Sequence, residues 1–192
     1  KCLDLAQDLL GTSDVDAVVV AAVDLSGSLE NVMLRQQMNP LNTADHSMGF
    51  NESVNGWSVG EGAGAVVLKR SADVTLDNQR PYCQIDGIGF SAGSDASAVA
   101  NASVRALNQA GKVATDIGYI AAFATRNSHE DQQEIAGLKA VYHSAGNVAD
   151  TVSDSNKKIT AIGSVKANVG HTYSASGMAS LIKTALCLKN RY

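Results

Sequence analysis

Apolar residues recur along the chain in two patterns, short continuous runs and helically spaced stretches. The continuous runs are rich in β-branched residues and predict buried strands at Asp16–Leu25, Cys83–Phe90, Ile117–Thr125 and Ile159–Val165. Helical spacing predicts helices at Lys1–Leu10, from Ser91–Ala100 to a closing Gly111, at Glu130–His143 and at Ser174–Leu188. Strands that alternate with helices predict an α/β fold with right-handed crossovers and a parallel sheet covered by helices.

The remaining segments are less regular. Residues Ser26–Ser53 read as irregular chain with a short helix at Asn31–Met38, and Arg70–Tyr82 reads as a loop. The polar interval Gly146–Lys158 is predicted to be the mobile loop. There is no linker or repeat, so we expect one domain over residues 1–192. Because no N-cap residue precedes the first helix, we expect that this helix begins upstream and that the chain is a fragment.

Composition narrows the function classes. The 192 residues are 45% hydrophobic and 18% charged, which is typical of a globular domain rather than a disordered chain. A net charge of −4 without a basic run argues against nucleic acid and against an anionic membrane surface as partners. Three widely separated cysteines, Cys2, Cys83 and Cys187, indicate neither a disulfide framework nor a metal site. A reducing, cytoplasmic location is the simplest expectation.

Candidate chemistry lies between the last predicted strand and the last helix. Lys166, Asn168, Gly170 and His171 place a cation and an imidazole in a tight turn at a helix N-terminus. Free N–H groups and the helix dipole favour anions and carbonyl oxygens at such a place. On spacing alone, a surface histidine in a plain strand-turn-helix connection remains the other interpretation.

A second segment, Gly56–Arg70, contains Gly60, Gly62 and Gly64. The sequence argues against a nucleotide-binding loop, because a strand at Ala65–Leu68 follows where a dinucleotide fingerprint needs a helix. The glycines instead predict close backbone packing beside a site, with Glu61 accepting from exposed amides. His46 has no second ligand at metal spacing and is interpreted as an ordinary loop histidine.

Two motifs carry a resemblance to a known family. The run S-V-K-x-N-x-G-H-T from Ser164 resembles the second-histidine motif of β-ketoacyl synthases, and G-W-S-V-G-E-G-A-G resembles their D-G-F-V-x-G-E-G-A-G block, with Trp57 for Phe and Asn55 for Asp. The resemblance implies a thiolase-like layered α/β/α/β/α fold, incomplete in this chain. Residues 1–70 would be the end of its N-terminal half and residues 71–192 most of its C-terminal half.

The resemblance also implies roles. In that family the histidine polarises the malonyl carbonyl during decarboxylative Claisen condensation and the lysine supports the site, which points to His171 and Lys166. No cofactor is expected to bind directly, because phosphopantetheine arrives on an acyl carrier protein. The catalytic cysteine of the family would fall upstream of Lys1, and neither Cys2 nor Cys187 can stand in for it.

One position departs from the family pattern. Where β-ketoacyl synthases carry H-G-T-G-T-P-L-G-D-P-I-E, this chain reads F-A-T-R-N-S-H-E-D-Q-Q-E, so that Phe123 replaces the first histidine. Phenylalanine cannot donate a hydrogen bond to a carbonyl. The block still matches at Thr125, Asp131 and Glu134, whereas His129 falls six residues too late to substitute.

Three functions follow from this departure. The favoured one is a ketosynthase-like chain length factor. It would pair with an active ketosynthase, as heterodimer or pseudo-dimer, in a bacterial polyunsaturated fatty acid synthase or a polyketide synthase, and would shape the acyl pocket. The alternative is an active β-ketoacyl synthase that tolerates Phe123, and the third is a structural partner without substrate contact. For Lys166 and His171, a retained catalytic role and the satisfaction of buried carbonyls both remain open.

Overall fold

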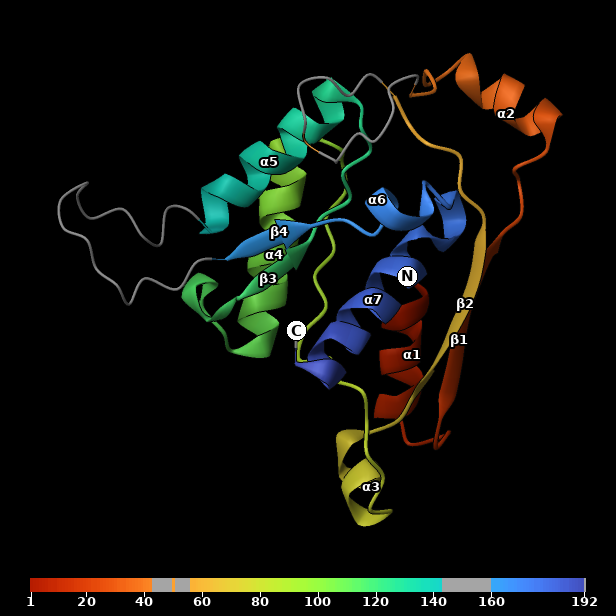
Figure 1. Ribbon diagram of the computed structural model, residues 1–192. Helices are drawn as coiled ribbons and strands as arrows, with labels where there is room; N and C mark the ends of the chain where they lie inside the picture. Colours follow the sequence, from red (N-terminus) through yellow and green to blue (C-terminus); the bar gives the residue numbers. More distant parts are fainter. Residues whose placement is uncertain (43–49, 51–55, 143–159, 192) are drawn as a thin grey trace, which may run out of the picture.

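Two small sheets lie on either side of a long helix in the computed structural model, which describes residues 1–42, 50, 56–142 and 160–191. One sheet pairs β1 (Val18–Asp24) with β2 (Gly62–Leu68), and the other pairs β3 (Tyr119–Ala121) with β4 (Ala161–Gly163). Helix α7 (Ser176–Asn190) runs between them (Figure 1). This arrangement of alternating strand and helix layers matches the predicted fold class.

The first sheet forms the core with two helices. Alternate residues of β1 and β2 face α1 (Cys2–Gly11) and α7, and the buried cluster contains Ala6, Val20 and Met178. Its partly buried surround consists of Leu3, Val18, Ala22, Val66, Leu68, Leu181 and Ile182. The predicted strand within Asp16–Leu25 therefore exists, and so does the strand predicted at Ala65–Leu68.

The environment predicted for that first strand is wrong. β1 pairs antiparallel with β2, from Val18 opposite Leu68 to Asp24 opposite Gly62, and not in a parallel ladder. Its outer face is open in the described chain, with Val19 66% exposed and Val67, its partner across the ladder, 67% exposed. A valine-rich run indicates that a strand can be buried on both faces. It does not indicate whether the neighbouring strand is parallel or antiparallel.

The connection after β1 contains α2 (Leu29–Gln36), capped by Ser28, which corresponds to the predicted short helix. The segment predicted as a loop at Arg70–Tyr82 instead begins with the helix α3 (Ser71–Leu76). An ion pair of 2.6 Å between Arg70 and Asp73 stabilises this first turn. A local ion pair of this kind explains a short helix that apolar spacing did not reveal.

The second half contains two packed helices, α4 (Ala96–Ala110) and α5 (Ser128–Tyr142), beside β3 and β4 (Figure 1). Asp95 caps α4 by accepting from the Ala98 amide at 3.0 Å, and Gly111 closes it with a φ of 63°. β3 and β4 pair in parallel, as predicted, but each is only three residues long. Ile162 in β4 is exposed, so the expectation of a fully buried strand is wrong there.

The predicted strand at Cys83–Phe90 is absent from the described structure. The Ile88 amide donates to the side chain of Gln109 on α4 at 2.6 Å rather than to a neighbouring strand. An apolar run indicates packing against another element, and for this segment that element is helix α4. His46, Asn55 and residues 146–158 lie outside the described residues, so nothing tests the predictions made for them.

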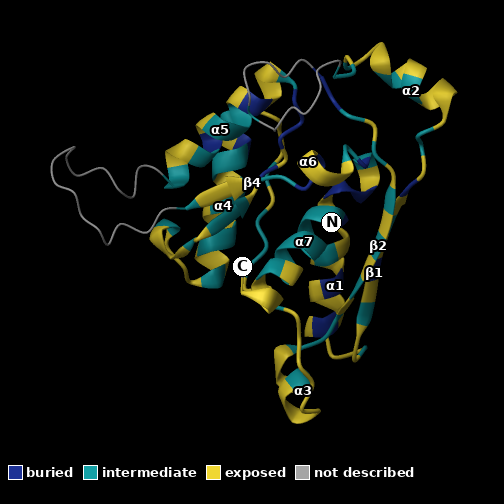
Figure 2. Cartoon of the chain, viewed as in Figure 1, coloured by how far each residue is buried: buried dark blue, intermediate teal, exposed yellow. Residues whose placement is uncertain are grey.

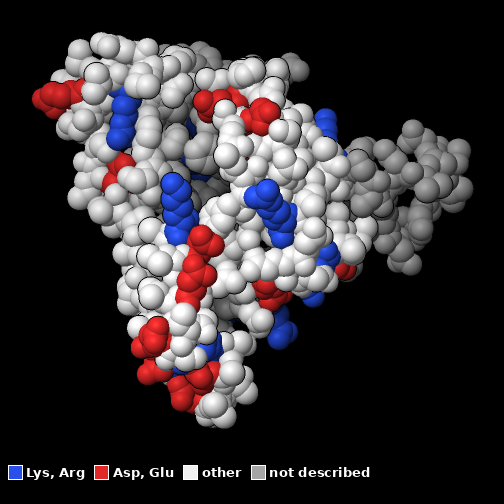
Figure 3. Space-filling model, turned by 180° about the vertical axis from the view of Figure 1, so that it is seen from behind, with Lys and Arg blue, Asp and Glu red and all other residues white. Residues whose placement is uncertain are grey.

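The face of the molecule seen in Figure 3 is largely uncharged. Buried residues are few and concentrate around α1, α7 and the strand ends (Figure 2). Charged side chains on the face seen in Figure 3 stand apart over broad uncharged areas, and acidic groups gather toward the end that carries α3. None of the described helices is long and apolar enough to cross a membrane.

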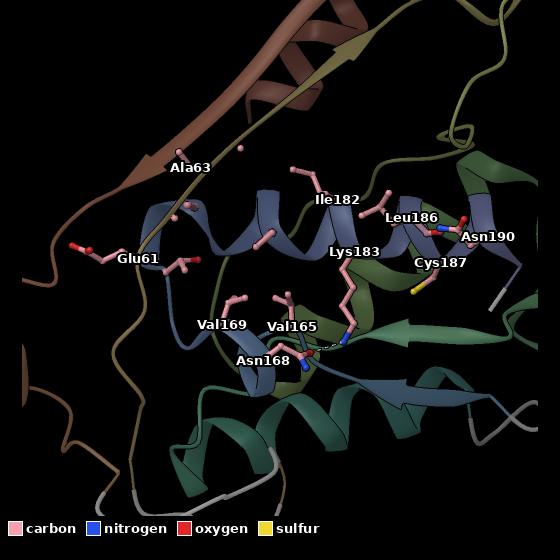
Figure 4. Close-up of a pocket in the computed structure, with 15 residues that line it drawn as sticks. Glu61, Ala63, Val165, Asn168, Val169, Ile182, Lys183, Leu186, Cys187 and Asn190 are labelled. Carbon is pink, nitrogen blue, oxygen red and sulfur yellow. Dashed lines mark hydrogen bonds between the residues drawn. The ribbon is translucent and has the colours of Figure 1, made fainter.

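Two clefts flank α7. The smaller, about 560 Å³, lies between β2, α7 and α6 (Lys166–Val169) and is lined mainly by apolar side chains, including Val165, Ile182 and Leu186 (Figure 4). At its edge Lys183 donates to the side chain of Asn168 at 3.2 Å. The larger, about 1050 Å³, lies between α1, β2, α7 and residues 79–88. Neither cleft is lined by His171.

Candidate active site

The chain after β4 folds as a single helical turn, α6, before it reaches His171. Gly170 has a φ of 74°, and the His171 amide then donates to the Ser58 carbonyl at 2.8 Å. A one-turn 3-10 helix, Tyr173–Ala175, leads from there into α7. The prediction that Lys166 and His171 lie in one tight turn at the N-terminus of the long helix is therefore wrong. Helix α6 separates Lys166 from His171, and the 3-10 helix separates His171 from α7.

This crossing is close because two glycines meet. A Cβ atom on Gly60 would collide with the carbonyl oxygen of Val169 and lie 2.8 Å from the carbonyl carbon of Gly170. The predicted close packing at the glycines is confirmed here and at Gly64, where a Cβ would lie 2.8 Å from Ile182. Glu61, as predicted, accepts from an amide, that of Gly27, at 2.7 Å.

The His171 ring is held as a neutral donor. Its Nδ1 accepts from the Tyr173 amide at 3.0 Å and lies 3.1 Å from the hydroxyl of Ser176. Because a backbone N–H can only donate, the hydrogen of the neutral ring is on Nε2. Burial first, and then the charges of Lys166 and Arg35, lower the pKa of His171 to about 4. At neutral pH the ring therefore presents an uncharged Nε2–H group.

Lys166 is almost fully buried, 4% exposed, and its ammonium group meets Phe123 in two ways. Nζ donates to the backbone oxygen of Phe123 at 2.5 Å and lies 3.5 Å from the centre of the Phe123 ring. Burial lowers the pKa of Lys166 to about 8, while the charges of Glu134 and Asp131 act in the opposite direction. The cation is thus held against an aromatic face by a cation–π contact.

Phe123 itself lies beside the histidine. Its ring meets His171 edge to face, with centroids 5.5 Å apart and planes at 87°, and the side chain is 51% exposed. The structure therefore brings together all three candidate residues, Phe123, Lys166 and His171. The side chain at position 123 cannot donate a hydrogen bond, so it adds no second donor beside His171.

Carboxylates of α5 hold the segment that carries Phe123. Glu134 accepts from the amides of Phe123 and Ala124 at 2.6 and 2.8 Å. Asp131 accepts from the Thr125 hydroxyl at 3.2 Å and from the Arg126 amide at 3.3 Å. Ala124 and Arg126 have positive φ angles of 45° and 68°, so these bonds stabilise an otherwise unfavourable backbone. The matching residues of the block thus keep its local shape.

An aromatic and charged surround completes the site. Trp57 is buried, donates from Nε1 to the Asn39 carbonyl at 2.7 Å, and meets Tyr173 edge to face at 5.1 Å. Tyr173 stacks on His171 with centroids 4.3 Å apart and planes at 15°. The guanidinium of Arg35 lies 3.5 Å from the centre of the Tyr173 ring.

Sequence reasoning missed most of this surround. Tyr173 carries only a weak local signal, because it directly follows the motif, which ends at Thr172. Arg35 and Asp24 have none, since they reach the site from segments far away in the chain. In the part of the chain that the structure describes, no group of three His, Cys, Asp or Glu side chains could hold a metal ion.

Comparison with known families places both halves of the chain in one family. The model of the β-ketoacyl synthase N-terminal domain matches residues 1–74, and that of the β-ketoacyl synthase C-terminal domain matches residues 82–192. The chain belongs to the β-ketoacyl synthase family. The segment that carries Lys166 and His171 lies within the match to the C-terminal domain.

Individual relatives point to two kinds of synthase. The chain is 35% identical, over all of its length, to a polyunsaturated fatty acid synthase of Thraustochytrium sp.. It is 32% identical, over 81% of its length, to probable polyketide synthase 33 of Dictyostelium discoideum. These matches span only 9% and 5% of those two proteins.

Solved structures confirm the thiolase-like ketosynthase fold. A structure described as PfaC keto synthase-chain length factor is 42% identical, with a TM-score of 0.74, over 96% of this chain and 18% of its own. The ketosynthase from module 6 of the bacillaene synthase of Bacillus subtilis is 29% identical, with a TM-score of 0.81, over 96% of this chain and 34% of its own. This chain thus holds part of a ketosynthase-type domain of the kind found in polyunsaturated fatty acid and polyketide synthases.

Proposed function

We propose that the domain to which this chain belongs is a ketosynthase-like chain length factor. It pairs with an active ketosynthase and helps to shape the space for the growing acyl chain, without carrying out condensation by itself. The observation that carries the proposal is Phe123, whose ring lies between the Lys166 ammonium and the His171 imidazole. A 42% identity to a structure described as a keto synthase-chain length factor supports a place in a pair of this kind, although that description names both members.

The chemistry of condensation explains why this residue matters. Decarboxylation of a malonyl thioester builds negative charge on the thioester oxygen, which a preorganised donor must stabilise. Removing one such donor typically costs about 10²–10³ in rate, or about 3–4 kcal/mol. The Nε2–H of His171 remains available, but groups of one site act as a unit, and a single donor recovers little of the lost rate.

The proposed partners follow from the same function. An active ketosynthase supplies the nucleophilic cysteine, and an acyl carrier protein delivers the acyl and malonyl groups on phosphopantetheine. No cofactor bound directly to this chain is needed for the role. In this setting Lys166 and His171 remain as a motif whose hydrogen bonds hold the Phe123 segment and the crossing at Ser58 in place.

The second candidate is an active β-ketoacyl synthase. It is favoured by the intact Lys166 and His171 and by the match to the ketosynthase of a polyketide module at 29% identity. In that case Phe123 would be a tolerated substitution, and a cysteine would precede this chain. The two candidates predict opposite results in one assay.

That assay uses the full-length domain containing this chain, with malonyl and acyl carrier proteins but without a partner ketosynthase. We expect neither acyl-enzyme nor ketoacyl product above background, measured by intact-protein mass spectrometry and product analysis. Phe123→His alone should not create activity unless a nucleophilic cysteine lies upstream. Phe123→Ala in the assembled pair should change product length or assembly more than the turnover of the partner's cysteine. Robust acylation and condensation by the unpaired domain would overturn the proposal in favour of the active enzyme.

A further inference from the structure

A stack of three side chains ends on the imidazole of His171, and one of the three comes from a distant part of the chain. The Tyr173 ring lies parallel to the His171 ring at 4.3 Å, and the Arg35 guanidinium lies 3.5 Å from the centre of the same Tyr173 ring. Arg35 comes from α2, whereas the two rings lie just before α7. Cation, phenol ring and imidazole thus follow one another in a column.

The Tyr173 ring contacts three side chains, those of His171, Arg35 and Trp57. The Trp57 ring meets the Tyr173 ring edge to face at 5.1 Å, and the backbone amide of Tyr173 donates to Nδ1 of His171 at 3.0 Å. The Tyr173 φ of 38° is in the left-handed region, which a residue with an aromatic side chain rarely adopts. Such a conformation persists only where the surroundings determine it, and those surroundings here are the stack and the amide bond to His171.

Arg35 is fixed from the other side by a buried carboxylate. Its Nη2 donates to the Ser26 hydroxyl at 2.8 Å and lies 4.0 Å from Asp24. Asp24 also accepts from the amide and the hydroxyl of Ser174, at 3.3 and 2.7 Å. Hydrogen bonds from Ser26 and Ser174 lower the pKa of Asp24 to about 2, so this carboxylate is charged at neutral pH. Asp24 therefore connects Arg35 to the residue that follows Tyr173.

We propose that Tyr173 and Arg35 are positioning residues for His171, which fix the plane of its imidazole and keep it neutral with its hydrogen on Nε2. The inference goes beyond the proposed function and does not depend on it, because it concerns the orientation and protonation of the His171 ring and not the reaction of the domain. Nε2 has no acceptor among the described residues, and every buried side-chain nitrogen or oxygen among them has a partner. The Nε2–H of His171 is thus open to a carbonyl oxygen from outside this part of the chain.

The charges that face His171 act in both directions, and the two cations outweigh the one carboxylate. Lys166 and Arg35 disfavour an imidazolium ion, Asp24 favours one more weakly, and burial adds to the effect of the two cations. The Tyr173 phenol, whose pKa is raised mainly by burial, stays uncharged at neutral pH. Loss of the Arg35 charge should therefore make protonation of His171 easier and raise its pKa.

The test follows the imidazole directly by NMR in the full-length domain, labelled with ¹³C and ¹⁵N at histidine and assigned by comparison with His171→Gln. We expect Arg35→Gln to raise the pKa of His171 by about one unit, and Arg35→Lys to leave it nearly unchanged. Tyr173→Leu should remove the ring-current shift of the His171 protons, and Tyr173→Phe should keep it. Lys112→Gln, at an exposed lysine remote from the site along the chain, is the matched control for loss of one positive charge.

The outcomes separate this inference from the proposed function. If the His171 pKa and chemical shifts are the same in Arg35→Gln and Tyr173→Leu as in the unchanged domain, the positioning role is overturned, whatever the domain catalyses. Arg35 is on a surface helix and a quarter exposed, so Arg35→Gln decides the question even if Tyr173→Leu does not fold. Condensation by the unpaired domain would overturn the proposed function and leave these spectra unaffected.

Discussion

Phe123 shows how one residue can change the chemistry of a site without changing its frame. Its backbone oxygen still accepts from Lys166 and its amide still donates to Glu134, so the segment keeps its place. Its ring, however, contacts the Lys166 ammonium with its face and meets the His171 ring in an edge-to-face contact. The backbone contacts of Phe123 do not depend on its side chain, which explains why the fold persists where the donor is lost.

Glu134 provides a prediction at this scale, because one carboxylate accepts from two adjacent amides. Glu134→Ala leaves the amide of the buried Ala124 without an acceptor, and we expect a loss of about 1–3 kcal/mol in the free energy of unfolding. The same change removes an anion that favours the Lys166 ammonium, so the pKa of Lys166 should fall further below about 8. Chemical denaturation and NMR titration of the full-length domain measure the two effects.

Gln132→Ala is the control for Glu134→Ala, because Gln132 is exposed on the same helix and contributes only a 3.5 Å contact to Ser128. Its effect on unfolding should stay within about 0.5 kcal/mol. Equal losses in the two variants would show that the carboxylate of Glu134 does not hold the segment.

At the scale of elements, apolar spacing predicted the helices well and the pairing of strands poorly. The helices at α1, α2, α4, α5 and α7 follow from signals within each segment, such as apolar spacing and, for α2 and α4, an N-cap residue. Pairing depends on a second segment, so the antiparallel β1–β2 ladder and the missing strand at Cys83–Phe90 could not be derived from either run alone. The contact of Arg35 with Tyr173 was not predicted for the same reason, since nothing in the sequence of α2 indicates an aromatic partner.

The crossing of Gly60 and Gly170 yields a prediction for the way β2 joins the His171 segment. Gly60→Ala should destabilise the domain by about 1–3 kcal/mol, because the new methyl group meets the backbone of Val169 and Gly170 rather than a movable side chain. The neighbouring Gly62→Ala is the matched control. Its Cβ would lie at an ordinary contact distance of 3.5 Å from Thr172, so the change should stay within about 0.5 kcal/mol. Thermal or chemical unfolding checks both, and a Gly60→Ala domain as stable as Gly62→Ala would contradict the close crossing.

On the scale of the whole molecule, the open face of the β1–β2 pair is the main unexplained surface. Every residue that points outward from this ladder is apolar: Val19, Ala21 and Val23 on β1, and Ala63, Ala65 and Val67 on β2. An apolar face of this kind is uncommon on a monomeric soluble protein. Since this chain spans about a third of the bacillaene ketosynthase it resembles, we expect the remainder of the domain or a ketosynthase partner to cover that face.

The corresponding experiment compares the 192-residue chain alone with the full-length domain. Alone, the chain should associate in size-exclusion chromatography and enhance the fluorescence of a hydrophobic dye several-fold, whereas the full-length domain should do neither. Placing lysines at the directly opposed pair, Val19→Lys with Val67→Lys, should reduce association of the isolated chain, because two charges then stand on the open face. In the full-length domain the same pair should be strongly destabilising, since the two charges would be buried without partners. Val113→Lys, at an exposed valine outside the ladder, should change neither property. A 192-residue chain that is monomeric, unfolds cooperatively and does not bind the dye would show that this face needs no cover.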